Sequence, residues 1–459
     1  MTITYPALQR LVVYRNLLQD PVVDKTLQLI SSLQGFESQS RSESESLYCS
    51  IVHMVLAKAG DFELAVDSWR NYILNLIVED ENVFSLGCEN KAPEAGSPVW
   101  DLARRDISIL KDLYNLNWNE VAREVGLDSS WWDHCWQPQP DTYPFHKHRV
   151  SKMTILHQLF SGESDPLIIL EALAGFYRAV GCGQMGKYPG FRWDQGLRGI
   201  RNPDPIELDE LVGIEEQKKM LLMNTEIFLR GNKANNVLLY GEKGTGKSSS
   251  VKALLTRYAP DGLRMIELGK DHVCYLADIA DTVRNRGFRF IVFIDDLSFE
   301  EFEVEYKHVK AAIEGSLEGT PGNLLLYVTS NRRHLVKETW RDRQSIDEEI
   351  HVSESHQEKL SLADRFGITI RYQAPSQEQY LRIVEHLARR NGLSLPSEEL
   401  RRRAIQWEMR YHGRSGRTAH QFVTYLLGQR HLDDPQTDER QEKSIGVRAQ
   451  TRIETSHIC

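Results

Sequence analysis

The sequence predicts an α/β protein: a core built on a parallel sheet, a C-terminal helical lid and an all-α N-terminal domain. Three observations support this fold class. Apolar residues in the first third of the chain recur only at helical spacings, short apolar runs alternate with helical stretches from Asp209 onward, and these runs stop beyond Pro375. Strands that are apolar throughout and alternate with helices form a parallel sheet covered on both faces.

Residues 1–180 are predicted to form the all-α domain. Two runs there carry apolar residues three or four positions apart: Phe62, Ala65, Val66, Trp69, Ile73 and Leu76, and then Trp100, Ala103, Ile107, Leu110 and Tyr114. Each run places one apolar stripe on a helix, which must pack against another helix. Segment 118–126 resembles the first half of a helix-turn-helix, but no basic second helix follows to enter a DNA groove.

Residues 181–206 are predicted to be a connector in which glycines, aromatic residues and basic residues alternate. The basic aromatic stretch 187–201 suits single-stranded nucleic acid, because aromatic rings stack on bases and cations neutralise phosphates. Lys187 and Arg192 are its candidate contacts. The alternative is a loop whose aromatic residues pack on a neighbouring domain, and we favour this alternative.

The α/β core is predicted over residues 207–374. Five apolar runs are expected to be strands: 236–240, 263–268, 288–294, 323–329 and 367–372. Helical stretches that begin at Lys247, at Asp271, at Phe299 and after Arg333 separate them. The lid follows over residues 375–430, where 376–379 is a capping box that opens a helix and 391–392 ends it. Residues 431–459 are polar and aperiodic, as in a flexible tail.

The motif Gly241-Glu242-Lys243-Gly244-Thr245-Gly246-Lys247-Ser248 follows one apolar run and opens a helix, which is the context that a phosphate-binding loop requires. Its glycines permit positive φ and let backbone N–H groups surround a phosphate without a Cβ in the way. The helix N-terminus adds about half a unit of positive charge. Lys247 is placed to reach the β- and γ-phosphates, and the Ser248 hydroxyl is placed to coordinate Mg²⁺.

Polar residues follow the next strands that are expected to end at the same edge. Asp295 and Asp296 come after the run 288–294, and Asn331 comes after the run 323–329. Ligands of open α/β folds bind at the carboxyl edge of the sheet. We expect Asp295 to hold Mg²⁺, directly or through water, and Asp296 to orient the attacking water. The Asn331 amide is expected to bond the γ-phosphate or that water, with a turn-forming asparagine as the alternative.

Together these residues resemble the AAA+ ATPases, whose core is of the P-loop NTPase type. Residues 208–214 are similar to the adenine-side box, 241–248 to Walker A, 290–296 to Walker B, 329–331 to sensor 1, 361–367 to the arginine-finger segment and 413–419 to sensor 2. More narrowly, 295–300, 329–335 and the segment around Arg365 resemble an uncharacterised bacterial family of AAA+-type ATP-binding proteins. That resemblance runs from near Gly181 to about Leu427, so the basic aromatic stretch is part of the family framework.

The resemblance implies that ATP lies between the core and the lid. The implied ATP contacts are Val212, Gly213, Gly241, Glu242, Lys243, Gly244, Thr245, Gly246, Lys247, Ser248 and Ser249, with Ser248 and Asp295 as Mg²⁺ ligands. Arg365 is implied to act in the site of a neighbouring subunit, because an arginine supplied in trans stabilises charge on the transferring phosphoryl group. This implies a homo-oligomer, a ring or a filament, whose sites are shared between protomers.

The resemblance leaves two questions open at the candidate catalytic residues Asp296, Asn331, Arg365 and Arg417. Arg417 is implied to contact the γ-phosphate in cis, but Arg414 competes for that role, and Arg365 and Arg417 could each form a surface ion pair instead. AAA+ enzymes usually carry glutamate where this chain has Asp296. Aspartate is shorter by one methylene, and a misplacement of about 1 Å costs roughly a hundredfold in rate. We therefore expect hydrolysis, and the sequence leaves its rate open; slow hydrolysis would suit a nucleotide-gated switch better than a fast motor.

Composition bounds the class of protein. The 459 residues are 41% hydrophobic and 26% charged, which excludes general disorder. The net charge of −9 argues against a protein that coats nucleic acid. The longest apolar runs fall short of a membrane span, the N-terminus lacks the pattern of a secretory signal, and the 6 cysteines form no C-x-x-C pair. We therefore expect a cytoplasmic protein without a membrane partner.

The expected function is hydrolysis of Mg-ATP that drives or switches the conformation of a client or an assembly. An unidentified protein client is expected to bind the N-terminal helical domain. One alternative is a nucleotide-gated scaffold with negligible hydrolysis. Another is a nucleic-acid-associated ATPase similar to helicase loaders, which the net charge of −9 disfavours.

Overall fold

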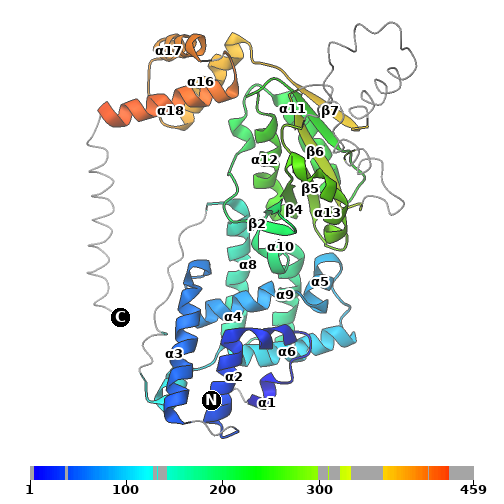
Figure 1. The fold of residues 1–459 in the computed structure, drawn as a ribbon, viewed down its shortest axis with the longest axis vertical. Coiled ribbons are helices and arrows are strands. Elements are labelled where there is room, and N and C mark those ends of the chain that lie inside the picture. Colours follow the sequence, from blue (N-terminus) through cyan, green and yellow to red (C-terminus); the bar gives the residue numbers. More distant parts are fainter. Residues whose placement is uncertain are drawn as a thin grey trace.

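The computed structural model describes residues 5–36, 40–127, 132, 142–297, 309, 321–331, 365–411 and 413–433. The N-terminal helices lie at one end of an elongated molecule, the sheet lies in the middle and the lid lies at the other end (Figure 1). The helices that the sequence predicts from Phe299 and after Arg333, and the tail beyond residue 433, lie outside the described residues.

Helices form the first part of the chain, as predicted. They are α1 (Tyr5–Leu8), α2 (Pro21–Leu33), α3 (Arg41–Ala57), α4 (Ser68–Glu79), α5 (Val83–Asn90), α6 (Pro98–Tyr114), α7 (Trp118–Val125), α8 (Pro144–Ser161) and α9 (Pro166–Ala179). Side chains that accept backbone N–H bonds begin most of them; Asp20 caps α2, and Ser40 forms a capping box on α3. The second predicted stripe lies on α6 and is buried, with Ile107 fully buried. The first is confirmed only in part: Trp69 and Ile73 are buried on α4, whereas Phe62, Ala65 and Val66 precede that helix and Ala65 is exposed.

A seven-stranded sheet forms the centre of the described structure. Its strands are β1 (Gly190–Trp193), β2 (Leu197–Ile200), β3 (Val237–Gly241), β4 (Leu263–Glu267), β5 (Arg289–Ile294), β6 (Leu324–Ser330) and β7 (Ile368–Tyr372), in the spatial order β2-β1-β4-β5-β6-β3-β7. All neighbours are parallel except β1 and β2. The five predicted runs are therefore all strands, and the predicted α/β core on a largely parallel sheet is confirmed.

The segment 181–206 differs from the predicted connector. It forms the short helix α10 (Gly183–Lys187) and the β1–β2 hairpin, and β1 extends the sheet beyond β4. Phe191 and Trp193 are buried while Arg192 between them is exposed, which is the two-residue period of a half-covered strand. Phe191 and Trp193 therefore pack inside the protein, as the favoured alternative predicts, but Tyr188 is half-buried and the segment is a hairpin of the sheet rather than a loop.

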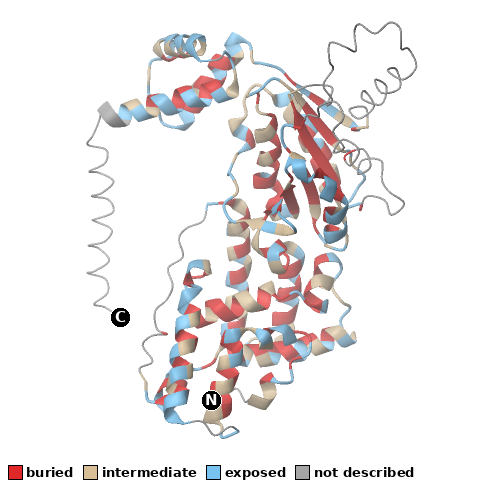
Figure 2. Cartoon of the chain, viewed as in Figure 1, coloured by how far each residue is buried: buried red, intermediate tan, exposed pale blue. Residues whose placement is uncertain are grey.

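Helices cover both faces of the sheet. The core contributes the helices α11 (Glu215–Leu229), α12 (Lys247–Tyr258) and α13 (Leu276–Val283). Short 3-10 turns occur in the N-terminal part, η1 (Arg15–Gln19) and η2 (Ala59–Asp61), and in the core, η4 (Leu208–Glu210), η5 (Ala259–Asp261) and η6 (Lys270–Tyr275). One hydrophobic cluster runs from the N-terminal helices through α12 to one face of the sheet, and a second cluster lies on the face covered by α13. The central strands are buried along their length (Figure 2).

Buried polar contacts also join the N-terminal helices to the core. The Glu89 side chain is fully buried; it accepts a bond from Arg286 at 2.6 Å and from the Cys182 N–H at 3.0 Å. A Cβ at Gly287 would lie 2.0 Å from the carbonyl oxygen of Glu89, so the two parts approach with backbone against backbone. A buried charge is tolerated when it is paired and hydrogen-bonded. The N-terminal helices are therefore packed onto the core across a junction that contains a buried ion pair.

The lid has a separate hydrophobic core. Its helices α16 (Gln377–Arg390), α17 (Ser397–Arg410) and α18 (Gly416–Asp433) bury Tyr380 and Phe422 among them, and the predicted capping box at 376–379 is present. Arg390 of α16 pairs with Glu207 at 2.9 Å and with Glu210 at 2.8 Å, which ties the lid to the segment before α11. None of the helices within the described ranges is both long enough and apolar enough to cross a membrane.

Candidate nucleotide site

The phosphate loop joins β3 to α12 at the carboxyl edge of the sheet. Gly241 has φ +140°, and a Cβ there would lie 1.8 Å from the carbonyl oxygen of Tyr372 in β7. Gly244 and Gly246 also have positive φ, at +75° and +95°. These conformations favour glycine, so the sequence motif has the backbone geometry that it predicts. The N-terminus of α12 opens directly into the loop.

Lys247 crosses the inside of this loop. Its Nζ donates to the carbonyl oxygens of Gly241 and Glu242, both at 2.7 Å, and to Asn331 Oδ1 at 3.2 Å. Burial lowers the pKa of the Lys247 ammonium, and the nearby carboxylates of Asp296 and Asp295 partly oppose that shift. A phosphate group at the loop would add a negative charge beside this buried cation.

Ser248 and Asp295 form a hydroxyl–carboxylate pair beside Lys247. Ser248 Oγ donates to Asp295 Oδ1 at 2.6 Å, and Thr329 Oγ1 donates to the same oxygen at 2.5 Å. Mg²⁺ binds oxygen ligands, and in phosphate sites it takes one or two from the protein and the rest from water and substrate. Within the part of the chain that is described, no group of three or more His, Cys, Asp or Glu could hold a metal. The Ser248–Asp295 pair nevertheless offers the one or two protein oxygens that Mg²⁺ takes in a phosphate site.

Two neighbours form hydrogen bonds with Asp296, one with its backbone N–H and one with its side chain. Asp296 has φ +52°, in the left-handed region that aspartate enters more readily than most residues. Its N–H donates to Thr329 Oγ1 at 2.9 Å, and Asn331 Nδ2 donates to its Oδ1. Both side chains line the same cavity. Because β6 lies between β3 and β5, Asn331 at its end stands between Lys247 and Asp296.

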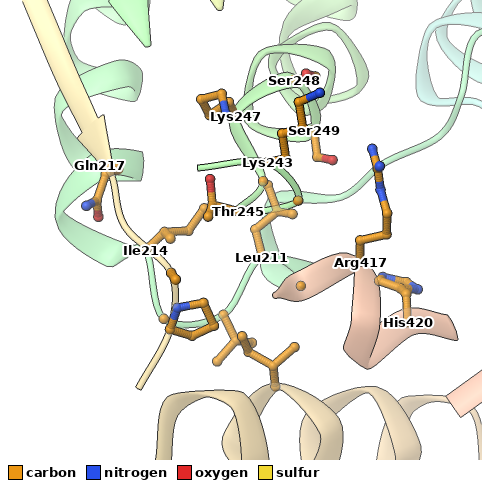
Figure 3. A pocket seen from close by; sticks show the side chains of 18 of the residues that line it. Leu211, Ile214, Gln217, Lys243, Thr245, Lys247, Ser248, Ser249, Arg417 and His420 are labelled. Atoms are coloured by element: carbon orange, nitrogen blue, oxygen red, sulfur yellow. The ribbon is translucent and has the colours of Figure 1, made fainter. Parts of the chain in front are cut away.

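These residues meet at a cavity of about 690 Å³ between the core and the lid. Figure 3 shows Lys243 and Thr245 of the phosphate loop near Arg417 and His420, which come from α18. Away from the loop, the lining includes the apolar residues Ile206, Leu211, Val212, Ile214, Pro375 and Ile383, together with polar residues such as Glu210, Gln217 and Gln379. A small-molecule site typically combines such an apolar part with a few polar groups.

The cavity contains most of the predicted nucleotide contacts. Val212, Gly213 and residues 243–249 line it, whereas Gly241 and Glu242 contribute carbonyl oxygens to Lys247 behind it. The sequence assigns no role to several lining residues, among them Gln217 and His420, and it marks Thr329 only as part of the segment 329–331. His420 lies three positions after Arg417 on one helix, so helical spacing could have found it.

The two competing arginines of the lid differ in their contacts. Arg414 Nε pairs with Glu408 at 2.5 Å. Arg417 lines the nucleotide cavity, its N–H donates to the Gly244 carbonyl oxygen at 3.3 Å, and its guanidinium makes no ion pair with any described residue. The geometry therefore favours Arg417 over Arg414 as the arginine beside the phosphate loop.

Arg365 does not line the cavity of its own chain. It precedes β7, whose first residue, Ile368, pairs with Val237 at the amino end of β3, while Tyr372 pairs with Gly241 at the loop. At ~3.3 Å per residue these four steps separate the two edges by ~13 Å. The structure thus keeps Arg365 away from the phosphate loop in cis. The rest of the predicted finger segment, 361–364, lies outside the described residues.

The basic residues of the stretch 187–201 are paired with carboxylates. Lys187 Nζ lies 3.6 Å from Glu79, and Arg192 lies 2.7 Å from Glu267. Phe191 is fully buried and Trp193 is 7% exposed. The rings needed to stack on bases are therefore inside the protein.

The sequence profile of one protein family, described as "Protein of unknown function (DUF815)", matches residues 186–430. Solved structures with a similar fold include the RuvB Holliday junction branch migration motor of Thermotoga maritima, which is 17% identical over 48% of this chain and 72% of that chain, with a TM-score of 0.31. They also include the FIGL-1 AAA domain in complex with ADP, which is 18% identical over 49% of this chain and 73% of that chain, with a TM-score of 0.34. No curated protein matches. The family match spans the phosphate loop and most of the lid.

Proposed function

The chain belongs to the DUF815 family of proteins of unknown function, and we propose that it binds and hydrolyses Mg-ATP to change the conformation of a client or an assembly. One observation carries this proposal. A single cavity is lined by Lys247, Ser248, Asp295, Asp296 and Arg417, which are a phosphate-binding lysine, a hydroxyl–carboxylate pair, a second carboxylate and an arginine from the lid. Phosphoryl transfer depends mainly on such positioning and on charge stabilisation.

Each group has a task in this proposal. The N-terminus of α12 and Lys247 hold the β- and γ-phosphates. Ser248 and Asp295 would hold the magnesium ion, which when bound neutralises charge on the phosphates. Asp296 orients the attacking water, and the Asn331 amide donates to the γ-phosphate or to that water. Arg417 adds positive charge at the γ-phosphate from the side of the lid.

The adenine base of ATP binds the apolar part of the same cavity in this proposal. Leu211, Val212 and Ile214 lie on one side, and Ile383 of the lid lies on another. The lid reaches this region through Arg417, whose N–H bonds the loop at Gly244, and through the Arg390 ion pairs. The proposed conformational change is therefore a movement of the lid as the γ-phosphate is lost. The N-terminal helices pack onto the core through one hydrophobic cluster and the Glu89–Arg286 pair, which supports a movement of the lid relative to a body formed by these helices and the core.

The proposed active form is a homo-oligomer in which Arg365 completes the site of a neighbour. Arg365 is held at the amino edge of the sheet, away from its own phosphate loop. A second cavity of about 940 Å³ opens beside that loop, lined among others by Lys243, Asn331 and Arg417, and it offers a route for a neighbour's arginine.

The client in this proposal binds the N-terminal helices. These helices carry exposed apolar side chains, including Phe36 at 59% and Val83 at 60%. Nucleic acid is not favoured as this client, because the stretch 187–201 buries its aromatic rings and pairs its cations. Capture with the variant Asp296→Asn, in which hydrolysis is expected to be blocked, would hold the client for identification.

Steady-state phosphate release tests the proposal. Wild type should release phosphate from ATP in the presence of Mg²⁺, and Lys247→Ala should abolish this release because the variant loses its phosphate cation. Lys218→Ala is a matched control, since Lys218 bonds the Leu208 carbonyl oxygen outside the lining of the cavity. ATP binding without turnover in wild type would instead favour the nucleotide-gated scaffold. Absence of ATP binding would refute both functions.

A further inference from the structure

Thr329, at the end of β6, makes contact with both carboxylate residues at the end of β5. It is 1% exposed. Its hydroxyl donates to Asp295 Oδ1 at 2.5 Å and accepts the N–H of Asp296 at 2.9 Å. A hydroxyl has one proton to donate and lone pairs to accept, so one Thr side chain can serve both neighbours at once.

The two bonds act on different features of the site. The bond to Asp295 fixes the oxygen that also accepts from Ser248 Oγ, and so sets the hydroxyl–carboxylate pair expected to hold Mg²⁺. The bond from Asp296 N–H supports a left-handed backbone at φ +52°. That conformation is unfavourable for a residue other than glycine, although aspartate tolerates it better than most, so it needs support from its surroundings.

We propose that Thr329 is a positioning residue for the ATPase reaction: its hydroxyl holds Asp295 for the metal and the backbone turn that places Asp296 in the nucleotide cavity. This inference rests on the proposed function. It also gives a reason for aspartate in place of glutamate at 296. The left-handed turn already brings the short side chain into the cavity, where Asn331 Nδ2 donates to it.

Replacement of the hydroxyl by a methyl group tests the inference. Thr329→Val should lower kcat roughly tenfold to a hundredfold, the scale of a displacement near 1 Å. It should also raise the Mg²⁺ concentration needed for half-maximal binding of a non-hydrolysable ATP analogue. Thr329→Ser should restore both values to near those of wild type, because serine supplies the same hydroxyl. Affinity for ADP without Mg²⁺ should stay unchanged.

Thr225→Val is the matched control for the loss of a buried hydroxyl. Thr225 is fully buried and bonds the Leu221 carbonyl oxygen and the Tyr327 hydroxyl, away from the cavity. It should lower the melting temperature without changing the Mg²⁺ requirement. A Thr329→Val variant that keeps the wild-type kcat and Mg²⁺ requirement would overturn the inference, and so would a Thr329→Ser variant as impaired as Thr329→Val.

The analogue-binding measurement separates this inference from the proposed function. If wild type binds the analogue with Mg²⁺ but shows no turnover, the ATPase proposal fails, while a weakened Mg²⁺ response in Thr329→Val still supports the role of Thr329 at Asp295. The role at Asp296 has its own variant. Asp296→Glu should not exceed the wild-type kcat, because the longer side chain overshoots from the left-handed turn; a faster Asp296→Glu enzyme would contradict the proposed positioning.

Discussion

The amide of Asn331 joins the phosphate-loop cation Lys247 to the carboxylate of Asp296. Its Oδ1 accepts from Lys247 Nζ at 3.2 Å, and its Nδ2 donates to Asp296 Oδ1. A γ-phosphate would compete for Lys247 and for the amide N–H groups, because its oxygens are strong acceptors. We therefore expect nucleotide entry to release Asp296 from Asn331, so that the carboxylate can bind the attacking water only when the substrate is present.

The two lid arginines give a prediction at the scale of single residues. Arg417→Ala should lower kcat about tenfold to a hundredfold, since a hydrogen bond to a charged group contributes ~1.5–3 kcal/mol. Arg414→Ala should stay within about twofold of wild type, because Arg414 is engaged with Glu408. Phosphate release measured for both variants, with melting curves to verify folding, checks this. Equal losses of kcat in the two variants would show that the Arg414–Glu408 ion pair does not distinguish the role of Arg414 from that of Arg417.

At the scale of elements, the strands that are continuous apolar runs could be predicted from the sequence. The strands that form only by pairing with another strand could not. β3 to β7 are apolar runs that the sequence displays directly. β1 and β2 have four residues each and sit among glycines, so they resemble a loop until β4 is available to pair with them. Helical periodicity likewise identifies the apolar face of an N-terminal helix but not the sheet that covers it.

The candidate site likewise contains residues that the sequence predicts and residues that it does not. The phosphate loop, Asp295, Asp296 and Asn331 could be predicted because a local motif or a strand end marks each of them. The hydroxyl of Thr329 could not be assigned a role, since its two bonds depend on how β6 aligns with β5. The left-handed turn at Asp296 is also set by that alignment.

The β1–β2 hairpin gives a prediction at this scale. Phe191→Ala should destabilise the protein by about 3–5 kcal/mol, because it leaves a cavity in the buried cluster on one face of the sheet. Arg192→Ala should cost no more than about 1 kcal/mol, since its ion pair with Glu267 is at the surface. Denaturant unfolding measures both. Single-strand binding should be absent in wild type and variants alike; binding that weakens in Arg192→Ala would restore the nucleic-acid interpretation of this stretch.

At the scale of the whole molecule, the described part of the chain forms two packed bodies of unequal size. The N-terminal helices and the sheet share one hydrophobic cluster and the buried Glu89–Arg286 pair, whereas the lid has its own core. The nucleotide cavity lies between these two bodies. A ligand there therefore contacts both bodies, and its γ-phosphate is the part that Arg417 and the phosphate loop would share. In the proposed cycle, loss of that phosphate shifts the lid relative to the other body.

Mixing two inactive variants tests whether the site is completed by a second copy. Lys247→Ala removes the phosphate cation from a protomer that still carries Arg365, and Arg365→Ala does the reverse. Each variant alone should show little phosphate release. If Arg365 acts in trans, mixing creates interfaces in which an intact pocket meets an intact arginine, about a quarter of all interfaces in a random equal mixture, and activity should recover to roughly that fraction of wild type. An arginine that acts only within its own chain predicts no recovery at any ratio. Sizing each variant with ATP present verifies that both still assemble, so that a lack of recovery in assembled mixtures counts against the shared site.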